Sequence, residues 1–197
     1  MTANDIRRRF RQLMDGVVSE NMRLCGTTYH INWGISLTHL QSLASEYEQD
    51  MHVALELWKD NVRESRIMAW MLMPPEEFTP DIAKLWSETL QTQEIAEAAA
   101  MLLYQHVAYA PAFAYSLLSG GDALQSILGY NIISRLVGQG HLPDARGLDE
   151  LIDNIRLSLS EGDTGVRRAA YNCLVKLDSS DRLSASPYWH TLCQGLI

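Results

Sequence analysis

The sequence predicts an all-α domain in which antiparallel helix pairs stack into a superhelix. Apolar residues recur at helical spacing along almost all of the 197 residues, and stretches that alternate β-branched with polar residues are absent. Hydrophobic residues make up 47% of the chain, enough for a sizeable core without disulfides or metals. Capping and helix-breaking residues divide the pattern into successive pairs of helices. We expect residues 1–197 to form one domain.

In the first half, local signals place the helix boundaries. Thr2 and Asp5 form a capping-box pattern before a helix over about 3–14. A second helical stretch ends near Gly26, and 27–35 reads as a connecting loop. Residues that cap or open the following helices are Ser36, Asp50, Asn61, Thr79 with Pro80, and Thr92; the Pro74 and Pro75 pair ends the helix that starts at Asn61, and the helix after Thr92 runs to about His106.

The second half continues in the same way. The expected helices are a short one from Pro111 to Gly120, one from Asp122 to Leu136, a pair over 148–159 and 164–177, and a short terminal one after Ser186. Glycines and a proline at 138, 140 and 143 mark the clearest loop of this half. Three tryptophans lie at helical spacing with other apolar residues, which predicts a place in the core: Trp58, Trp70 and Trp86.

Cysteine usage and the N-terminus limit the class of protein. The three cysteines are far apart and odd in number, which favours neither a disulfide framework nor a zinc site: Cys25, Cys173 and Cys193. The arginines at 7–11 are not followed by an apolar run, and no stretch is long and apolar enough to span a bilayer. We therefore expect a cytoplasmic protein that uses no metal or cofactor and does not contact membranes.

The net charge of −8 is unevenly distributed. Residues 46–97 hold twelve acidic and four basic side chains, so this segment accounts for a net −8 and the remainder is neutral. Affinity for nucleic acid comes mainly from neutralising phosphate charge, which argues against a broad phosphate-binding surface. A local basic groove remains compatible with this distribution.

Helix pairs repeating at roughly 35 to 45 residues are typical of HEAT-like and armadillo-like superhelices. Two segments carry the residue order found where the second helix of a HEAT repeat begins: Asp163, Val166, Arg167 and Ala170, and more loosely Asn61, Val62, Arg66 and Ala69. In such repeats the alanine permits close packing, and the arginine reaches acidic or carbonyl groups of the neighbouring repeat. The predicted fold is therefore a HEAT-like α-α superhelix.

The stretch from Trp33 to Met73 carries a family resemblance. Its matching residues are Gly34, Ile35 and Ser36 before a helix with Leu40, Ala44 and Tyr47, then Ala54, Leu57, Trp58 and Lys59, and then Glu64, Arg66, Ile67 and Ala69. The chain resembles the DNA alkylation repair family, HEAT-like repeat proteins that include alkylpurine DNA glycosylases. This resemblance implies a DNA repair scaffold that binds damaged duplex DNA and hydrolyses the N-glycosidic bond of 3- or 7-alkylpurines.

The resemblance also implies a set of catalytic groups. Active family members use an aspartate and a tryptophan near the start of the helix that here begins around Thr92, an arginine in a later helix, and a second tryptophan. Glu97 stands at the aspartate position and is the candidate catalytic residue. The tryptophan positions fall on Gln93 and near Asn172, and the arginine position falls on 126–127, so three of the four groups are missing. The sequence therefore predicts little or no glycosylase activity.

Two functions follow from these observations. In the first, the chain binds duplex DNA through arginines at the starts of repeat helices, namely Arg63, Arg66, Arg167 and Arg168. In the alternative, it is a non-catalytic helical-repeat scaffold that binds a protein partner, as the acidic segment 46–97 and the missing catalytic groups suggest. The sequence leaves both open.

Overall fold

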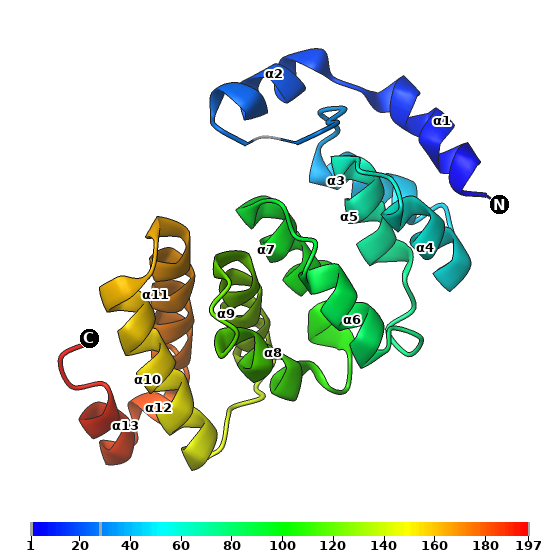
Figure 1. Ribbon diagram of the computed structural model, residues 1–197. Coiled ribbons are helices and arrows are strands. Elements are labelled where there is room, and N and C mark those ends of the chain that lie inside the picture. The colour runs from blue at the N-terminus through cyan, green and yellow to red at the C-terminus, as the bar shows by residue number, and fades with distance from the viewer. Residues whose placement is uncertain (1, 28, 197) are drawn as a thin grey trace. The chain divides into compact units, whose positions relative to one another are not determined.

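The computed structural model describes residues 2–27 and 29–196 (Figure 1). Within these ranges all regular elements are helical, and strand-like pairing is confined to one isolated parallel bridge between Ile31 and Val62. The predicted all-α class is therefore confirmed. The chain divides into two compact units, Met1–Val107 and Ala108–Ile197, which are described separately.

The first unit begins with two helices joined to the rest by a long loop. Its helices are α1 (Ala3–Leu13), α2 (Gly16–Leu24), α3 (Leu37–Ala44), α4 (Met51–Trp58), α5 (Arg63–Leu72), α6 (Pro80–Ser87), α7 (Gln93–Leu102) and the short 3-10 helix η1 (Tyr104–His106). The predicted caps Ser36, Asp50, Thr79 and Thr92 all accept backbone N–H groups of the first turn. Most helix starts of this unit are therefore set locally.

Two boundaries differ from the sequence prediction. The helix expected to open at Asn61 begins at Arg63, because Val62 is extended and paired with Ile31. The helix after Thr92 ends at Leu102 and not at His106, because residues Tyr104–His106 form the separate 3-10 helix η1. There the buried Tyr104 hydroxyl donates to the Ala83 carbonyl oxygen at 2.7 Å. Tertiary contacts decide both positions.

Helix α5 is the centre of the first unit. It packs against α3, α4 and α7, and eight of its ten residues are buried. Trp70 on α5 meets Trp58 and Trp86 edge-on at ring-centroid distances of 4.7 and 4.9 Å, and those two rings stack on each other at 4.0 Å. The predicted core position of the three tryptophans is confirmed, with Trp58 half-buried.

The second unit consists of two long helix pairs and a short C-terminal addition. Its helices are α8 (Ala110–Leu118), α9 (Ala123–Gly138), α10 (Ala145–Glu161), α11 (Thr164–Asp178), α12 (Asp181–Ser184) and α13 (Pro187–Leu192). Helix α9 packs against α8 and α11, and α10 packs against α11. Helix α10 starts three residues before the expected 148, because Asp144 caps it by accepting the N–H of Gly147 at 2.8 Å.

Helices α9 and α11 run in parallel, as the second helices of successive repeats do. Ser134 of α9 hydrogen-bonds to Cys173 of α11, and the Lys176 side chain crosses Gly138 at the end of α9. A Cβ at Gly138 would lie 3.1 Å from Lys176 Cε, so glycine admits this close approach. In the described part of the chain, no helix combines the length and apolar character needed to cross a bilayer.

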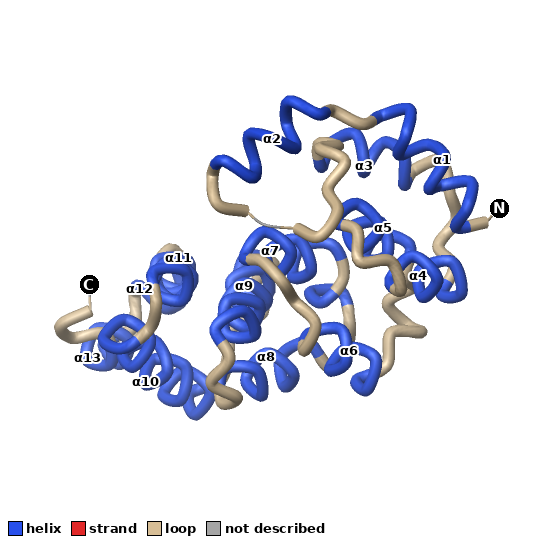
Figure 2. The backbone as a smooth tube through the Cα atoms, turned by 45° about the horizontal axis from the view of Figure 1, so that its top comes forward, coloured by secondary structure: helices blue, strands red, loops and turns tan. Residues whose placement is uncertain are grey.

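The loop between α2 and α3 (Figure 2) passes close to the first turn of α2, and the closest approach is at Gly34. Gly34 has φ +73°, and an added Cβ would fall 2.0 Å from the Asp15 carbonyl oxygen and 2.8 Å from the Ser19 nitrogen. The Asp15 N–H also donates to the Trp33 carbonyl oxygen at 2.8 Å. Glycine is therefore required here for both its conformation and its small size.

We expect Gly34→Ala to lower the free energy of unfolding by about 3 kcal/mol or more, because left-handed strain adds to a backbone clash. Gly26→Ala is the matched control: Gly26 has φ +83° but an added Cβ would meet nothing within 4 Å. It should cost about 1 kcal/mol. Urea unfolding followed by circular dichroism measures both, and equal losses would contradict the close approach at Gly34.

Candidate nucleic-acid interface

Arg63, a predicted DNA contact, is buried at the start of α5. It is 3% exposed, and its Nε donates to Glu94 Oε2 of α7 at 3.0 Å. Its Nη1 donates to Glu64 Oε1 at 3.0 Å and to the Ile35 carbonyl oxygen at 2.9 Å. The guanidinium is thus held between two carboxylates inside the first unit. It is not available to a phosphate, and its predicted role in DNA binding is corrected to a structural one.

The same carboxylates anchor the loop before α3. Glu64 accepts the backbone N–H groups of Trp33 at 3.0 Å and Ile35 at 3.3 Å. The Tyr29 hydroxyl donates to Glu94, and its ring lies 6.0 Å from the Arg63 guanidinium carbon. The cluster of Tyr29, Arg63, Glu64 and Glu94, called here the Arg63 network, therefore joins α5, α7 and the loop.

Glu94 remains ionised within the Arg63 network. Burial acts to raise its pKa, but the hydrogen bonds from Arg63 and Tyr29 outweigh burial and bring the pKa below its ordinary value of 4.5. The pKa of Arg63 is raised, because the hydrogen bond and charge of Glu94 outweigh desolvation. Burial raises the pKa of the Tyr29 hydroxyl, which stays protonated and can donate.

Arg66, the second predicted DNA contact, also turns inward. Its guanidinium carbon lies 4.4 Å from the ring centroid of Trp58, and Nη1 donates to the Thr89 carbonyl oxygen at 2.8 Å. Burial lowers its pKa. Arg66 therefore bridges to the segment after α6, as the arginine of a HEAT repeat does, and since it is partly exposed its contact with DNA stays a prediction.

Glu97, the candidate catalytic residue, is half-buried on α7. Its Oε1 accepts a hydrogen bond from Gln93 Nε2 one turn earlier at 2.7 Å. Where the resemblance implies a carboxylate beside a tryptophan ring, the structure has a carboxylate held by an amide. This pair offers no aromatic surface to support a cationic base or an oxocarbenium-like sugar.

Arg167 and Arg168, the other predicted contacts, lie side by side on the exposed side of α11. The helix begins at the cap Asp163, which accepts the Val166 N–H at 2.8 Å. Its inner side is fixed by buried residues at helical spacing, namely Val166, Ala169, Ala170, Cys173, Leu174 and Leu177. The exposed side, called here the α11 face, consists of Arg167, Arg168, Tyr171, Asn172, Val175 and Lys176.

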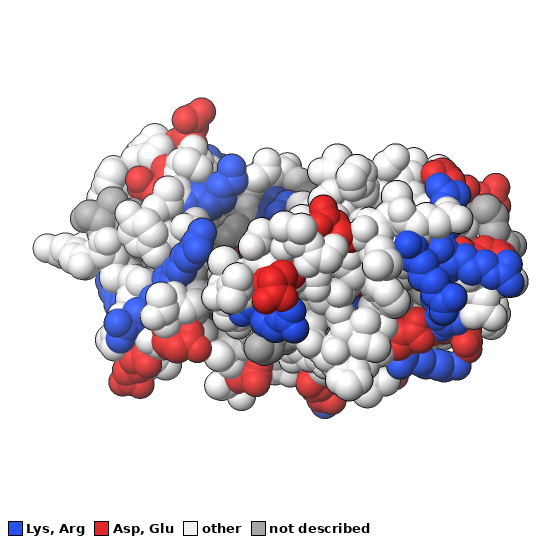
Figure 3. All heavy atoms as spheres, turned by 90° about the horizontal axis from the view of Figure 1, so that it is seen from above, with Lys and Arg blue, Asp and Glu red and all other residues white. Residues whose placement is uncertain are grey.

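Basic side chains make up half of the α11 face. Between Thr164 and Leu177 the helix has three cationic side chains and no carboxylate. Arg167 is steadied by a hydrogen bond from Nη2 to the Ser160 carbonyl oxygen at 3.2 Å, while Arg168 and Lys176 are exposed. Figure 3 shows basic side chains interspersed with acidic ones over the region of α10 and α11, and a denser basic group over α1. Within the α11 face a phosphate would meet cations and no carboxylate, whereas Asp163 and Asp178 lie at the two ends of the helix.

Sequence reasoning missed Tyr171 and Lys176. The helical period of α11 could have identified them. Its six apolar positions define the buried side of the helix, and both residues fall on the opposite side together with Arg168. Tyr171 is 55% exposed. Asn172, near which the resemblance places a second tryptophan, is exposed beside it.

The acidic segment 46–97 is largely engaged with the first unit itself. Arg9 of α1 makes two hydrogen bonds to Glu46 at 2.9 and 3.1 Å, and Arg7 makes two to Asp60 at 2.7 and 3.0 Å. Together with the Arg63 network, these contacts pair four of its twelve carboxylates with three arginines. The segment is therefore less negative at its surface than its composition suggests.

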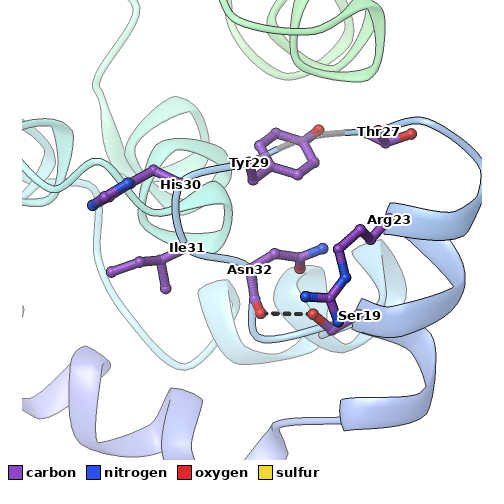
Figure 4. Close-up of a pocket in the computed structure, with 7 residues that line it drawn as sticks. All are labelled: Ser19, Arg23, Thr27, Tyr29, His30, Ile31 and Asn32. Atoms are coloured by element: carbon purple, nitrogen blue, oxygen red, sulfur yellow. Dashed lines mark hydrogen bonds between the residues drawn. The ribbon is translucent and has the colours of Figure 1, made fainter.

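A cavity of about 290 Å³ lies between α2 and the following loop (Figure 4). Its lining residues are Ser19, Arg23, Thr27, Tyr29, His30, Ile31 and Asn32. The Ser19 hydroxyl donates to the Asn32 carbonyl oxygen at 3.0 Å, and Arg23 pairs with Glu20. In Figure 4 the His30 side chain points away from Arg23, whose guanidinium extends toward Ser19 and Asn32.

Antiparallel pairs with parallel second helices define the HEAT-like repeat class. No family model matches the sequence, and no curated protein matches it. A solved structure described as "a new family of proteins related to the HEAT-like repeat DNA glycosylases with affinity for branched DNA structures" matches with a TM-score of 0.84 and 12% identity. The match covers 98% of this chain and 81% of that chain. The predicted HEAT-like fold, and the resemblance at the level of fold, are confirmed.

We expect Glu94→Gln to lower the free energy of unfolding at neutral pH by about 1–2 kcal/mol, a value reduced from that of a fully buried pair by partial exposure of Glu94. Because its pKa is lower in the folded state, the stabilisation is present above the ordinary value of 4.5 and is lost as the pH falls through the folded-state pKa. The difference between wild type and variant should therefore shrink in acid.

Urea unfolding at a series of pH values measures this difference. The matched control is Glu56→Gln, which removes an exposed carboxylate paired with Lys59 in the same unit and should leave the urea midpoint nearly unchanged. A Glu94→Gln difference that stays constant or grows in acid would show that its ionised form does not stabilise the fold.

Proposed function

We propose that this protein binds DNA through the α11 face and does not release alkylated bases. The observation that carries the proposal is the absence of carboxylates from a helix surface that presents three cations. The matched structure's description, with its affinity for branched DNA, supports a role in DNA binding and in the class of DNA repair scaffolds. Reduced, free Cys173 and Cys193, both buried, fit the cytoplasm as the place of action.

The binding would be local and sensitive to salt. With a net charge of −8, attraction to DNA must come from one part of the surface and not from the whole molecule. Arg167 and Arg168 supply planar guanidinium groups that suit phosphate oxygens, and Lys176 adds a point charge about two turns away. Each phosphate that they neutralise releases bound counterions, which makes affinity fall as salt rises.

The pairing of Glu97 with Gln93 supports a non-catalytic role. Hydrolysis of the glycosidic bond of an alkylpurine requires stabilisation of a cationic sugar and a placed water. Glu97 could contribute charge, but its amide partner takes up one of its oxygens at 2.7 Å. We therefore propose recognition of DNA without base excision.

A helical-repeat scaffold for a protein partner remains the second candidate. It was favoured by the acidic segment, yet four of those carboxylates pair within the first unit. What remains at the surface includes Glu48, Glu76, Glu77 and Glu88. Binding of a basic protein that is unaffected by changes on α11 would favour this candidate over DNA.

Arg168→Ala should weaken binding to a labelled DNA duplex several-fold and make the plot of log affinity against log salt shallower by about one unit, because one phosphate contact is lost. Fluorescence anisotropy over a salt series measures both. Arg146→Ala, at an exposed arginine on α10 of the same unit, is the matched control and should leave both values unchanged. No salt-dependent binding by the wild type would end the proposal.

We expect the wild-type protein to release no 7-methylguanine from methylated DNA above the rate without enzyme, because its carboxylate lacks the aromatic partner and the arginine that the resemblance implies. Chromatography of the released bases measures this. Release that is measurable in the wild type and disappears in Glu97→Gln would show that base excision is retained.

A further inference from the structure

Tyr171 occupies the middle of the α11 face. It is 55% exposed, and within residues 2–27 and 29–196 its hydroxyl has no hydrogen bond. It follows Arg168 by three residues and Arg167 by four, so it lies one helical turn from both. Val175, 47% exposed, continues the stripe one turn further. An apolar strip thus runs between positive charges.

The ring is presented from a rigid support. Cys173 and Leu174 beside it are fully buried against the rest of the unit, and the helix is capped at Asp163. Tyr188, the other strongly exposed tyrosine of the described residues, is different, because its hydroxyl donates to Asp149 and braces α13 against α10. Tyr171 has no such structural role, and a large exposed ring without one is a candidate contact for a ligand.

The ligand that suits this strip combines a flat apolar surface with phosphates on both sides. Arg168 and Lys176 are eight positions apart in the sequence, about 12 Å along the helix, and both have long side chains. In a paired duplex the faces of the bases are covered by their neighbours, and a ring on a helix surface meets only backbone and groove edges. An unpaired nucleotide exposes a face on which an aromatic ring can stack.

We infer that the α11 face recognises DNA where a nucleotide is unpaired, with Tyr171 stacking on that base while Arg168 and Lys176 hold the flanking phosphates. This inference rests on the proposed function and makes it specific: gaps, forks and flaps bind more tightly than continuous duplex. The stack requires the ring of Tyr171 and not its hydroxyl, so phenylalanine can replace it. A leucine or alanine cannot.

The test compares two labelled DNA probes of one sequence, a continuous duplex and a duplex with a short single-stranded gap, with the full-length protein. The wild type should bind the gapped probe more tightly. Tyr171→Ala should lower affinity for the gapped probe about 5- to 100-fold, the range for loss of one stacked base, and change duplex affinity less than about twofold. Tyr171→Phe should retain the preference, and Arg168→Ala should weaken both probes alike.

A second readout follows the stack itself. 2-Aminopurine placed in the gap should lose fluorescence on binding the wild type or Tyr171→Phe and keep it with Tyr171→Ala. Tyr188→Ala is the control for an exposed tyrosine elsewhere in the unit: it should quench 2-aminopurine as the wild type does, while loss of the bond to Asp149 lowers its thermal midpoint. The thermal midpoint of each variant, measured by circular dichroism, identifies any general loss of folding.

The outcomes separate the two proposals. If Tyr171→Ala weakens both probes equally or neither, or if the gapped probe gains no affinity in the wild type, the inference is overturned while DNA binding through the α11 arginines stands. If the wild type binds neither probe, the proposed function fails with it. A preference for single-stranded RNA of the same sequence over the gapped DNA would also overturn the assignment to DNA.

Discussion

The ion pairs of the buried Arg63 guanidinium are the interaction on which the packing of the first unit depends. The guanidinium lies between Glu64 and Glu94 and donates to the Ile35 carbonyl oxygen, so it helps to fix the position of the loop before α3. Burying one cation is costly unless carboxylates accompany it, and here two do. Through Glu64 the loop before α3 is bound to α5, and through Glu94 the start of α7 is bound to the same point. Three segments distant in sequence thus share one charge.

That arrangement also decides where the protein can offer positive charge. Arg63 and Arg66 are used inside the first unit, and Arg7 and Arg9 pair with carboxylates of the acidic segment. Helix α11 of the second unit is different, since Arg167, Arg168 and Lys176 are exposed and its residues 164–177 include no carboxylate. The same repeat signature therefore gives a structural arginine in one unit and an available one in the other.

Local chemistry explains what could be predicted from sequence. Caps such as Ser36 and Thr92 act within four residues, so helix starts were correct where such a cap was present. The predicted start of α5 was wrong because Val62 pairs with Ile31 in the preceding loop. The burial of Arg63 was not predicted because its partner Glu94 lies thirty-one positions later in the sequence. The exposure of Tyr171 could be predicted from the helical period of α11 alone. That its hydroxyl has no hydrogen-bond partner among the described residues could be seen only in the fold.

The stacked tryptophans have a practical consequence for spectroscopy. Trp58 and Trp86 lie 4.0 Å apart and within 9° of parallel, close enough for the excitations of the two indoles to couple into an exciton signal in circular dichroism. Four of the five tryptophans belong to the first unit, and Trp189 alone belongs to the second. The exciton signal therefore reports the folding of the first unit by itself. The α11 face has no tryptophan and does not contribute to this signal.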